Sequence, residues 1–511
     1  MVDRQKPSKT METMVDHATH FAWVLLSGVG SYGEQIPVAK EDKYLGVILD
    51  SKLLWKKHLT IKCQKAIAVL WQCRRIVSSK WGLSPKSTRW LYTSVIRPML
   101  TYASAIWWPR TFVGSAVAEL NHVQRLACLA ITGTVRTAPT SALEVMLDLL
   151  PLDIYIRKEA KLTTLRLLSE GRWKRQPDSK HSDILDVVEV KFSAMPEDRI
   201  RKIHIFQQLF STSIPSRNDW LQKGMECVPS ADVTCFTDGS LVNGKAGAGV
   251  HLVLGQEIIE QSFPLGRHTS VFQAEVFAVL QGTYLLLEMN LVGMLVNIFI
   301  DSQACIRALS SVSIRSKVVK ECKEALNRLC HNNRVWLFWV PGHEGFQGNE
   351  AADCLANIGS RESPIGPQPM VGIAPNIKKS VVNDWAMRKH AELWNNVQGC
   401  RQGRELMTGP EKGRTRTLVS LPRQQVRLIA GILTGHNLLN RHLAIMKLRP
   451  DGLCEGCMEE DETSSHFLCR CPCYAGIRAL YLGSTQLPVD RIKEIPVRVL
   501  VAYILATKRF S

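Results

Sequence analysis

The stretch VTCFTDGSLVNGKAGAGVHLVLGQEIIEQSFPL, residues 233–265, decides the fold of the central part of this chain. Short apolar runs in it are separated by turn residues, and Asn243-Gly244 is a hairpin signal. The stretch therefore predicts strands joined by tight turns. Three strands are expected, over 233–237, 246–254 and 258–265.

The residues that follow this stretch mix helices with single strands. Apolar positions recur every three or four residues from 272 to 289, which is typical of a helix packed on one face. The order βββαβααβα predicts an α/β domain over 231–360 with a mixed five-stranded sheet. The other strands are expected at 296–300 and 335–340, and the other helices at 303–309, 318–330 and 349–358.

Four acidic residues of this domain stand where they could form one site. Asp238 and Asp301 are expected to end the first and fourth strands, at the open edge of the sheet. Glu275 falls on the inward side of the first helix, where a buried carboxylate needs a partner. Asp353 falls in the first turns of the last helix, whose expected N-cap is Asn349. Each acid alone is more often a surface or cap residue, but four together predict an oxygen-only site that suits Mg²⁺ or Mn²⁺.

The motifs TDGS, QAE, IDSQA and WVPGHEGFQGNEAADCLA together resemble type 1 ribonuclease H, in the version carried by non-LTR retrotransposons. The resemblance covers 231–360 and implies a ribonuclease H-like fold. It also implies endonucleolytic hydrolysis of the RNA strand of RNA/DNA hybrids by a two-metal mechanism. The cofactors expected from it are two Mg²⁺ or Mn²⁺ ions. The metal-binding carboxylates that it implies are Asp238, Glu275, Asp301 and Asp353.

The same resemblance assigns roles to three further residues. His343, in PGHEG, matches a mobile histidine that assists proton transfer and product release. Without the motif, His343 would be read as a surface loop histidine. Gly239 and Ser240 form a turn that we expect to contribute to substrate binding, where 2′-hydroxyls distinguish RNA from DNA.

Residues 44–170 show helical periodicity with basic residues between the apolar ones. Helices are expected at 59–77, 85–103, 116–131 and 141–149. Periodicity alone would allow a solvated helical bundle. However, KYLGVILDSKLLWKKHL, WLYTSVIRPMLTYASAIWWPR and LNHVQRLACLAITGTVRTAPTSALEVMLDLLPLD resemble the segment after the polymerase palm in jockey-like non-LTR reverse transcriptases. That resemblance implies a thumb-like, template-gripping region. The residues ahead of Tyr44 contain no Asp-Asp pair, so we expect a 5′-truncated reading frame without DNA polymerase activity.

The C-terminal region contains a metal-ligand pattern. A proline-rich linker is expected over 361–380, followed by basic helices at 381–397 and 424–447. Then Cys-x2-Cys-x8-His-x4-Cys predicts one Zn²⁺ in a tail that orders on binding it, with clustered free thiols as the alternative. The tail resembles the zinc-knuckle-like tail that follows ribonuclease H in the same retrotransposons. Its expected ligands are Cys454, Cys457, His466 and Cys471, with Cys469 and Cys473 left free.

Composition and charge indicate the kind of partner and the cellular compartment. The 511 residues carry 64 lysines and arginines against 46 acids, a net charge of +18. Residues 231–360 have a net charge of −3 and the rest +21, which favours a nucleic-acid partner that is held mainly outside the central domain. Fifteen cysteines, mostly scattered, indicate a reducing compartment rather than a disulfide framework. No signal peptide or membrane span is recognisable, so we expect an intracellular protein, nuclear or cytoplasmic. The oligomeric state is left open.

These expectations combine into one hypothesis. The chain is predicted to be a retrotransposon-derived ribonuclease acting on RNA/DNA hybrids, with a helical thumb-like region and a small zinc-binding tail beside the ribonuclease domain. The alternative is a catalytically silent, nucleic-acid-binding retrotransposon relic. The expected parts are an N-terminal remnant (1–43), the thumb-like region (44–215), the ribonuclease domain (231–360), the linker (361–380) and the basic region with the zinc tail (381–511).

Overall fold

The computed structural model describes residues 40–75, 82–169, 184, 195–366, 368 and 370–510. The chain divides into two compact units, and neither is continuous in sequence. Unit 1 comprises 1–163, 179–184 and 383–511, and unit 2 comprises 164–178 and 185–382. Most of the predicted remnant at 1–43 lies outside the described residues.

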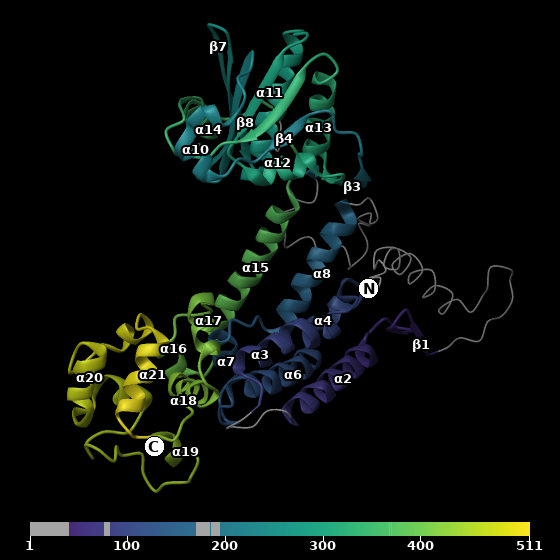
Figure 1. The fold of residues 1–511 in the computed structure, drawn as a ribbon. Helices are drawn as coiled ribbons and strands as arrows, with labels where there is room; N and C mark the ends of the chain where they lie inside the picture. Colours follow the sequence, from purple (N-terminus) through teal and green to yellow (C-terminus); the bar gives the residue numbers. More distant parts are fainter. Residues whose placement is uncertain are drawn as a thin grey trace, which may run out of the picture. The chain divides into compact units, whose positions relative to one another are not determined.

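Unit 2 is built on one mixed sheet (Figure 1). Strand order is β4-β10-β8-β5-β6-β7, with β4, β10, β8 and β5 parallel and the β5-β6-β7 meander antiparallel. The mixed sheet confirms the prediction, but the five-strand count was wrong, because the three-residue β4 precedes residue 231 and is too short to show a pattern. The strands are β4 (Ser211–Ser213), β5 (Val233–Val242), β6 (Lys245–Leu254), β7 (Glu257–Arg267), β8 (Leu295–Ile300) and β10 (Arg334–Trp339).

Helices cover both faces of this sheet. On one face, α11, α12 and α13 close an apolar core against the sheet that includes Val279, Ile298 and Leu326. On the other face α14 lies against β6, where a Cβ on Gly249 would lie 2.2 Å from the carbonyl oxygen of Ala352. The helices are α11 (Val271–Glu288), α12 (Gln303–Ser310), α13 (Lys317–Leu329) and α14 (Gln347–Arg361), each close to its predicted range.

The start of α14 corrects one detail of the prediction. Its N-cap is Phe346 and not Asn349, which is buried inside the first turn. The sequence did not indicate this start, because Phe346 makes no side-chain capping bond and is not a typical N-cap residue.

Segments outside 231–360 complete unit 2. Strand β3 (Arg199–His204) pairs with β9 (Ser313–Ser316), and α10 (Arg217–Lys223) with the short η4 (Gly224–Cys227) precedes β5. After α14, Ile373 is fully buried and bridges to Glu197. Unit 2 is therefore wider than the predicted domain, and part of the expected 361–380 linker packs against it.

The N-terminal part of unit 1 is mostly helical, as predicted for its described residues. The helix expected at 85–103 is interrupted by a π-helical turn, η1, and ends at Leu100, ahead of Ala103, which takes a left-handed φ of 55°. Its elements are β1 (Glu41–Tyr44), β2 (Val47–Asp50), α2 (Lys56–Arg75), α3 (Pro85–Leu91), η1 (Tyr92–Ile96), α4 (Arg97–Leu100), α5 (Ser104–Trp107), η2 (Trp108–Phe112), α6 (Gly114–Thr132), α7 (Thr140–Met146) and α8 (Leu152–Ser169, which ends in unit 2).

The C-terminal part of unit 1 shares one core with these N-terminal helices. Leu120 of α6, Ile429 of α18 and Phe467 of η5 belong to the same buried cluster. The helix expected at 424–447 is two helices, because α18 ends at Gly435, whose φ is 77°. The elements are α15 (Pro375–Asn396, which begins in unit 2), α16 (Arg401–Leu406), α17 (Lys412–Ser420), α18 (Arg423–Thr434), α19 (Asn440–Ile445), η5 (His466–Arg470), η6 (Pro472–Tyr474), α20 (Ala475–Leu482), η7 (Val489–Lys493) and α21 (Val497–Ala506).

The described helices are short or polar relative to a membrane-spanning helix. None of them combines the length and the apolar character that crossing a bilayer requires.

Candidate active site and metal centres

Three of the predicted carboxylates meet in unit 2. One oxygen each from Asp238, Glu275 and Asp301 lies within 4.8 Å of the other two. Asp301 directly follows β8, as expected, and β8 is the parallel neighbour of β5. Asp238 does not end its strand, however, because the pairing of β5 with β6 continues from Asp238 to Val242. The two aspartates reach one site because parallel neighbours carry them to the same level of the sheet.

Two glycines make the close approach possible. A Cβ on Gly239 would lie 2.3 Å from the backbone nitrogen of Glu275, so α11 can sit against β5 only when residue 239 lacks a side chain. A Cβ on Gly342 would lie 2.9 Å from Oδ2 of Asp301. Gly239 and Ser240 lie within β5 and not in the expected turn, because β5 stays paired with β6 past Asp238. Their expected contact with substrate stays a prediction.

The electrostatics of the cluster favour a cation. Burial, followed by the charges of Asp301 and Asp353, raises the pKa of Asp238 to about 8. Burial is also the main cause that raises the pKa of Glu275 well above its usual range and raises the pKa of Asp301. Oε2 of Glu275 is buried without a hydrogen-bond partner. Crowded, partly unsatisfied carboxylate oxygens fit a hard divalent cation such as Mg²⁺ or Mn²⁺.

Asp353 lies beside this cluster and not within it. Its charge helps to raise the pKa of Asp238, but its oxygens are not part of the group in which all ligand atoms lie within 4.8 Å. Nδ2 of Asn357 donates to Oδ1 of Asp353 over 2.9 Å, and Oγ of Ser240 donates to Oδ1 of Asn357 over 2.5 Å. Ser240 is therefore linked to the acids through Asn357. Sequence reasoning missed Asn357, although its position one helical turn after Asp353 was a usable signal.

His343 lies on the loop between β10 and α14. Its side chain is exposed, and its backbone is left-handed with a φ of 56°. The histidine is close enough to Asp301 to favour the charged form of that carboxylate, although burial outweighs this effect on the Asp301 pKa. The structure thus brings His343 to the rim of the cluster.

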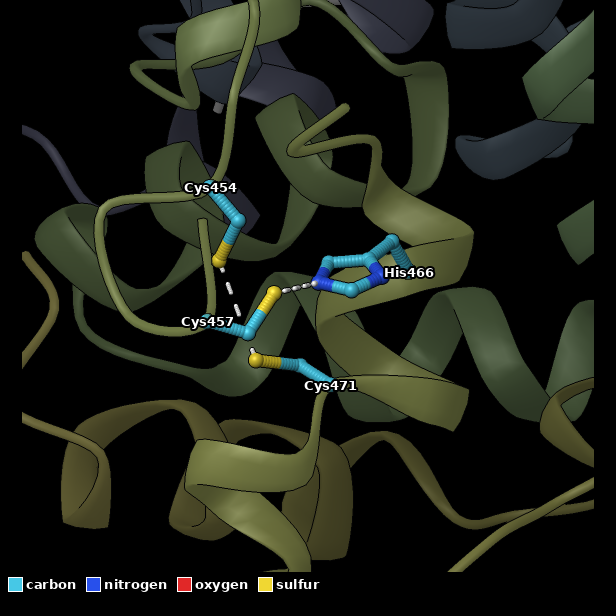
Figure 2. Close-up of side chains that lie close together, drawn as sticks. All are labelled: Cys454, Cys457, His466 and Cys471. Carbon is cyan, nitrogen blue, oxygen red and sulfur yellow. Dashed lines mark hydrogen bonds between the residues drawn. The ribbon is translucent and has the colours of Figure 1, made fainter. Parts of the chain in front are cut away.

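The second cluster lies in unit 1 and contains the four expected zinc ligands (Figure 2). Sγ of Cys454 lies 3.7 Å from Sγ of Cys471, and Sγ of Cys457 lies 3.4 Å from Nε2 of His466. All four ligand atoms are within 4.8 Å of one another. Three thiols and one imidazole converging on a point match the donor set of a tetrahedral zinc site.

The surroundings of this cluster favour the ligand form of two of its four residues. Nδ1 of His466 contacts Oε2 of Glu460 at 3.2 Å, which leaves Nε2 facing the thiols. Burial alone would raise the pKa of the Cys457 thiol, but hydrogen bonds from the backbone of Glu459 and Glu460, together with the neighbouring cysteine side chains, lower that pKa. Cys469 instead belongs to the unit 1 core, where burial raises its pKa to about 11.

The loop of the cluster is acidic, and arginines pair with most of its acids. Nε of Arg509 contacts Oε1 of the fully buried Glu462 at 2.7 Å. Other pairs join Arg449 to Glu455 and Arg441 to Asp461. The cluster is therefore tied into unit 1 by ion pairs as well as by the shared apolar core.

Comparison with known proteins identifies the class of unit 2. Residues 230–361 match the family model described as RNase H. This segment is an RNase H domain, as the sequence motifs indicated.

Part of the chain is homologous to Pol polyproteins of R1 non-LTR retrotransposons. It is 26% identical over 122 residues to the putative 115 kDa protein in type-1 retrotransposable element R1DM of Drosophila melanogaster, covering 24% of this chain and 12% of that protein. It is 22% identical over 188 residues to the retrovirus-related Pol polyprotein from type-1 retrotransposable element R1 of Nasonia vitripennis, covering 36% of this chain and 54% of that protein. The match thus spans at most about half of these relatives.

Solved structures similar to part of this chain include a ribonuclease and a reverse transcriptase. RNase H1 from Halobacterium salinarum NRC-1 is 23% identical, covers 25% of this chain and 96% of its own, and gives a TM-score of 0.21. The protease-reverse transcriptase of prototype foamy virus is 20% identical, covers 26% of this chain and 21% of its own, and gives a TM-score of 0.22.

Proposed function

We propose that unit 2 hydrolyses the RNA strand of RNA/DNA hybrids endonucleolytically. The observation that carries this proposal is the buried group of Asp238, Glu275 and Asp301, whose oxygens converge with one of them unpartnered. A fold that merely needed stability would not gather three acids at the cost of their desolvation. The RNase H family match over 230–361 supports the same reaction.

The carboxylates are assigned the role of holding two Mg²⁺ or Mn²⁺ ions. Bound there, the ions would supply an activated water and neutralise charge on the leaving oxygen. Asp238, Glu275 and Asp301 provide the converging oxygens. Asp353, oriented by Asn357, adds a carboxylate at the more exposed side of the group.

The remaining residues act on the substrate side of the site. His343 is exposed at the rim, where it can exchange protons with solvent and with the departing product. Gly239 lets α11 approach β5, Ser240 orients Asn357, and we also assign both residues to substrate binding. Hybrid recognition itself is assigned to backbone and 2′-hydroxyl contacts.

The test is a labelled RNA/DNA hybrid incubated with the purified full chain and Mg²⁺. We expect cleavage of the RNA strand alone, with 3′-hydroxyl and 5′-phosphate ends, and no cleavage by Asp301→Asn. That variant keeps the shape of the side chain and removes a charge that cation binding requires. Cleavage by Asp301→Asn at the parent rate would reject the site.

The alternative, a catalytically silent nucleic-acid-binding relic, gives a different result in the same experiment. The parent would then bind the hybrid without cutting it. Its binding would rest on the basic excess outside 231–360.

We further propose that Cys454, Cys457, His466 and Cys471 hold one structural Zn²⁺. The closed set of four ligands leaves no open position for substrate, which is typical of structural sites. The arginines beside the cluster are paired with its acids, which leaves little positive charge for nucleic acid. We therefore assign the cluster a role in the stability of unit 1 and not in nucleic-acid binding. Zinc content of the purified protein tests this: about one Zn²⁺ per chain is expected, and none would reject it.

A further inference from the structure

Helix α10 (Arg217–Lys223) touches the loop that carries His343, although it precedes the matched RNase H segment. The helix is only seven residues long but is locally stabilised by a capping box. Oγ of Ser216 accepts from the backbone N–H of Asp219, and Oδ2 of Asp219 accepts from the backbone N–H of Ser216. The capping box stabilises the helix from which Arg217 and Trp220 make their contacts.

The first contact is apolar and lies at the end of the loop. Trp220 is 1% exposed and packs edge-on against Phe346, with ring centroids 5.0 Å apart. It also meets Phe299, two residues before Asp301, at 6.3 Å. Phe346 is the residue from which α14, the helix of Asp353, begins. Trp220 thus packs between Phe346, at the end of the loop, and Phe299, which lies on the strand that leads to Asp301.

The second contact is ionic and lies beside the histidine. Nη2 of Arg217 contacts Oε1 of Glu344, the residue that directly follows His343. Both side chains are partly solvent-exposed, so the pair is worth little to overall stability. Its effect is local, because it fixes the side chain next to His343 and neutralises a carboxylate at the rim of a site that must admit phosphates.

The loop has a third anchor at its start. Gly342 lies against Asp301, where a Cβ would be 2.9 Å from Oδ2. Nε1 of Trp339 donates to the backbone carbonyl of Asp301 over 2.8 Å. With both ends fixed, the left-handed His343 between them is confined to the rim of the cluster.

We propose that α10 is a positioning element for the His343 loop, with Arg217 and Trp220 as positioning residues. This inference rests on the proposed hydrolase function, because it assigns the element that sets how the histidine meets the substrate. It also extends the working site beyond 230–361, into a segment that the family model does not include.

A charge swap tests the ionic half of this proposal in the full chain. Arg217→Glu places two carboxylates together and should lower kcat on the hybrid about fivefold, with KM less affected, because the loop acts on the bound complex. The double variant Arg217→Glu/Glu344→Arg restores the pair with reversed charges and should recover most of the activity. Lys223→Glu, an exposed charge reversal on the same helix, is the matched control and should keep the parent kcat.

Hydrogen exchange of residues 341–350 supplies a readout that does not depend on cleavage. Arg217→Glu should speed exchange in this loop at an unchanged midpoint of thermal unfolding, and the swap should slow it again. Unchanged exchange and kcat in Arg217→Glu, or equal reductions of kcat in Lys223→Glu, would overturn the proposal. A parent that binds but never cleaves would reject the proposed function, while exchange alone would still decide whether α10 holds the loop.

Discussion

The carboxylate cluster of unit 2 and the Cys/His cluster of unit 1 both bring their ligand atoms within 4.8 Å of one another, but their surroundings differ. Around Cys457, backbone N–H groups lower the thiol pKa and thereby favour the ligand form. Around Asp238, burial and neighbouring acids raise the pKa and disfavour the charged form. Among the cysteines of the Cys/His cluster the pKa is thus lowered at Cys457 only, while burial raises the pKa of Cys454 and raises that of Cys471 to about 12. In the carboxylate cluster, burial raises the pKa of all three acids.

We relate this difference to the two proposed roles, structural for the Cys/His cluster and catalytic for the carboxylates. A structural site gains when every ligand is satisfied within the fold, as His466 is by Glu460. A reactive site needs groups that remain unsatisfied until substrate and cation arrive, as Oε2 of Glu275 is. Substitutions in the two clusters should therefore change stability in opposite directions.

The largest effect is expected on cleavage. Glu275→Gln removes one of the converging charges and should lower the cleavage rate on the order of 10²- to 10³-fold, as removal of a main electrostatic group does. Glu288→Gln, at the exposed end of the same helix α11, should leave the rate unchanged. Rates are measured on a labelled hybrid with saturating Mg²⁺. Similar rates for the two variants would remove the distinction between the clusters.

The next effect is expected on the stability of unit 1. Cys457→Ser should abolish zinc binding and lower the free energy of unfolding by about 4 kcal/mol, the scale expected when a structural metal is removed. Cys473→Ser is the control, because Cys473 is exposed and outside the group of four. Zinc content and urea unfolding followed by circular dichroism measure both. Retained zinc in Cys457→Ser, or absent zinc in Cys473→Ser, would contradict the ligand assignment.

The two clusters also differ in what made them predictable. The four Cys/His ligands fall within eighteen residues, so their spacing alone indicates a site. The carboxylates are spread over more than a hundred residues, and they were identified because strand ends and family motifs marked each one. The common core that joins the Cys/His segment to α6 could not be predicted, because no local pattern encodes contacts between residues hundreds of positions apart.

Short elements show the same limit. The sequence did not indicate β4 or α10, since three and seven residues are too few for a period to emerge. Both are defined by partners far along the chain, β10 for β4 and Phe346 for Trp220 of α10. The extension of β5 past Asp238 was not predicted for a related reason. Gly239 weakens the strand pattern in the sequence, whereas in the structure the strand continues because it pairs with β6.

A comparable effect is expected in the pH dependence of stability. The native state keeps the Asp238 proton between pH 3.8 and about 8, whereas the unfolded chain releases it near pH 3.8. The unfolded state then binds fewer protons, so the free energy of unfolding should fall as pH rises through this window. Each unit of pKa shift is worth about 1.4 kcal/mol. In Asp238→Asn, the free energy of unfolding should decrease less between about pH 5 and pH 8. Urea unfolding without Mg²⁺ at the two pH values measures this. An unchanged decrease would contradict a raised Asp238 pKa in the native state.

The smallest effect is expected on hybrid affinity. On α2 of unit 1, burial and the charges of Lys65 and Lys43 lower the pKa of Lys62, and the Nζ of Lys62 lies 4.7 Å from the ring centre of the half-exposed Tyr102. Crowded lysines beside an exposed ring are suited to a phosphate backbone with stacked bases. Lys62→Gln/Lys65→Gln, made in the inactive Glu275→Gln protein, should weaken binding. The variant should also reduce the slope of log K against log salt by about one for each phosphate that these lysines neutralise.

The control for this pair of lysines comes from unit 2. Lys320 on α13 is exposed and pairs with Glu324 at 3.7 Å, so Lys320→Gln should leave both the affinity and the salt slope nearly unchanged. Fluorescence anisotropy of a labelled hybrid across a salt series measures both quantities. Because the RNase H segment 231–360 is net negative and the rest of the chain carries +21, electrostatic attraction should come mainly from outside that segment. Equal slopes for the α2 and α13 variants would show that the α2 lysines do not contact the phosphates of the hybrid. The α2 lysines would then no longer account for the affinity.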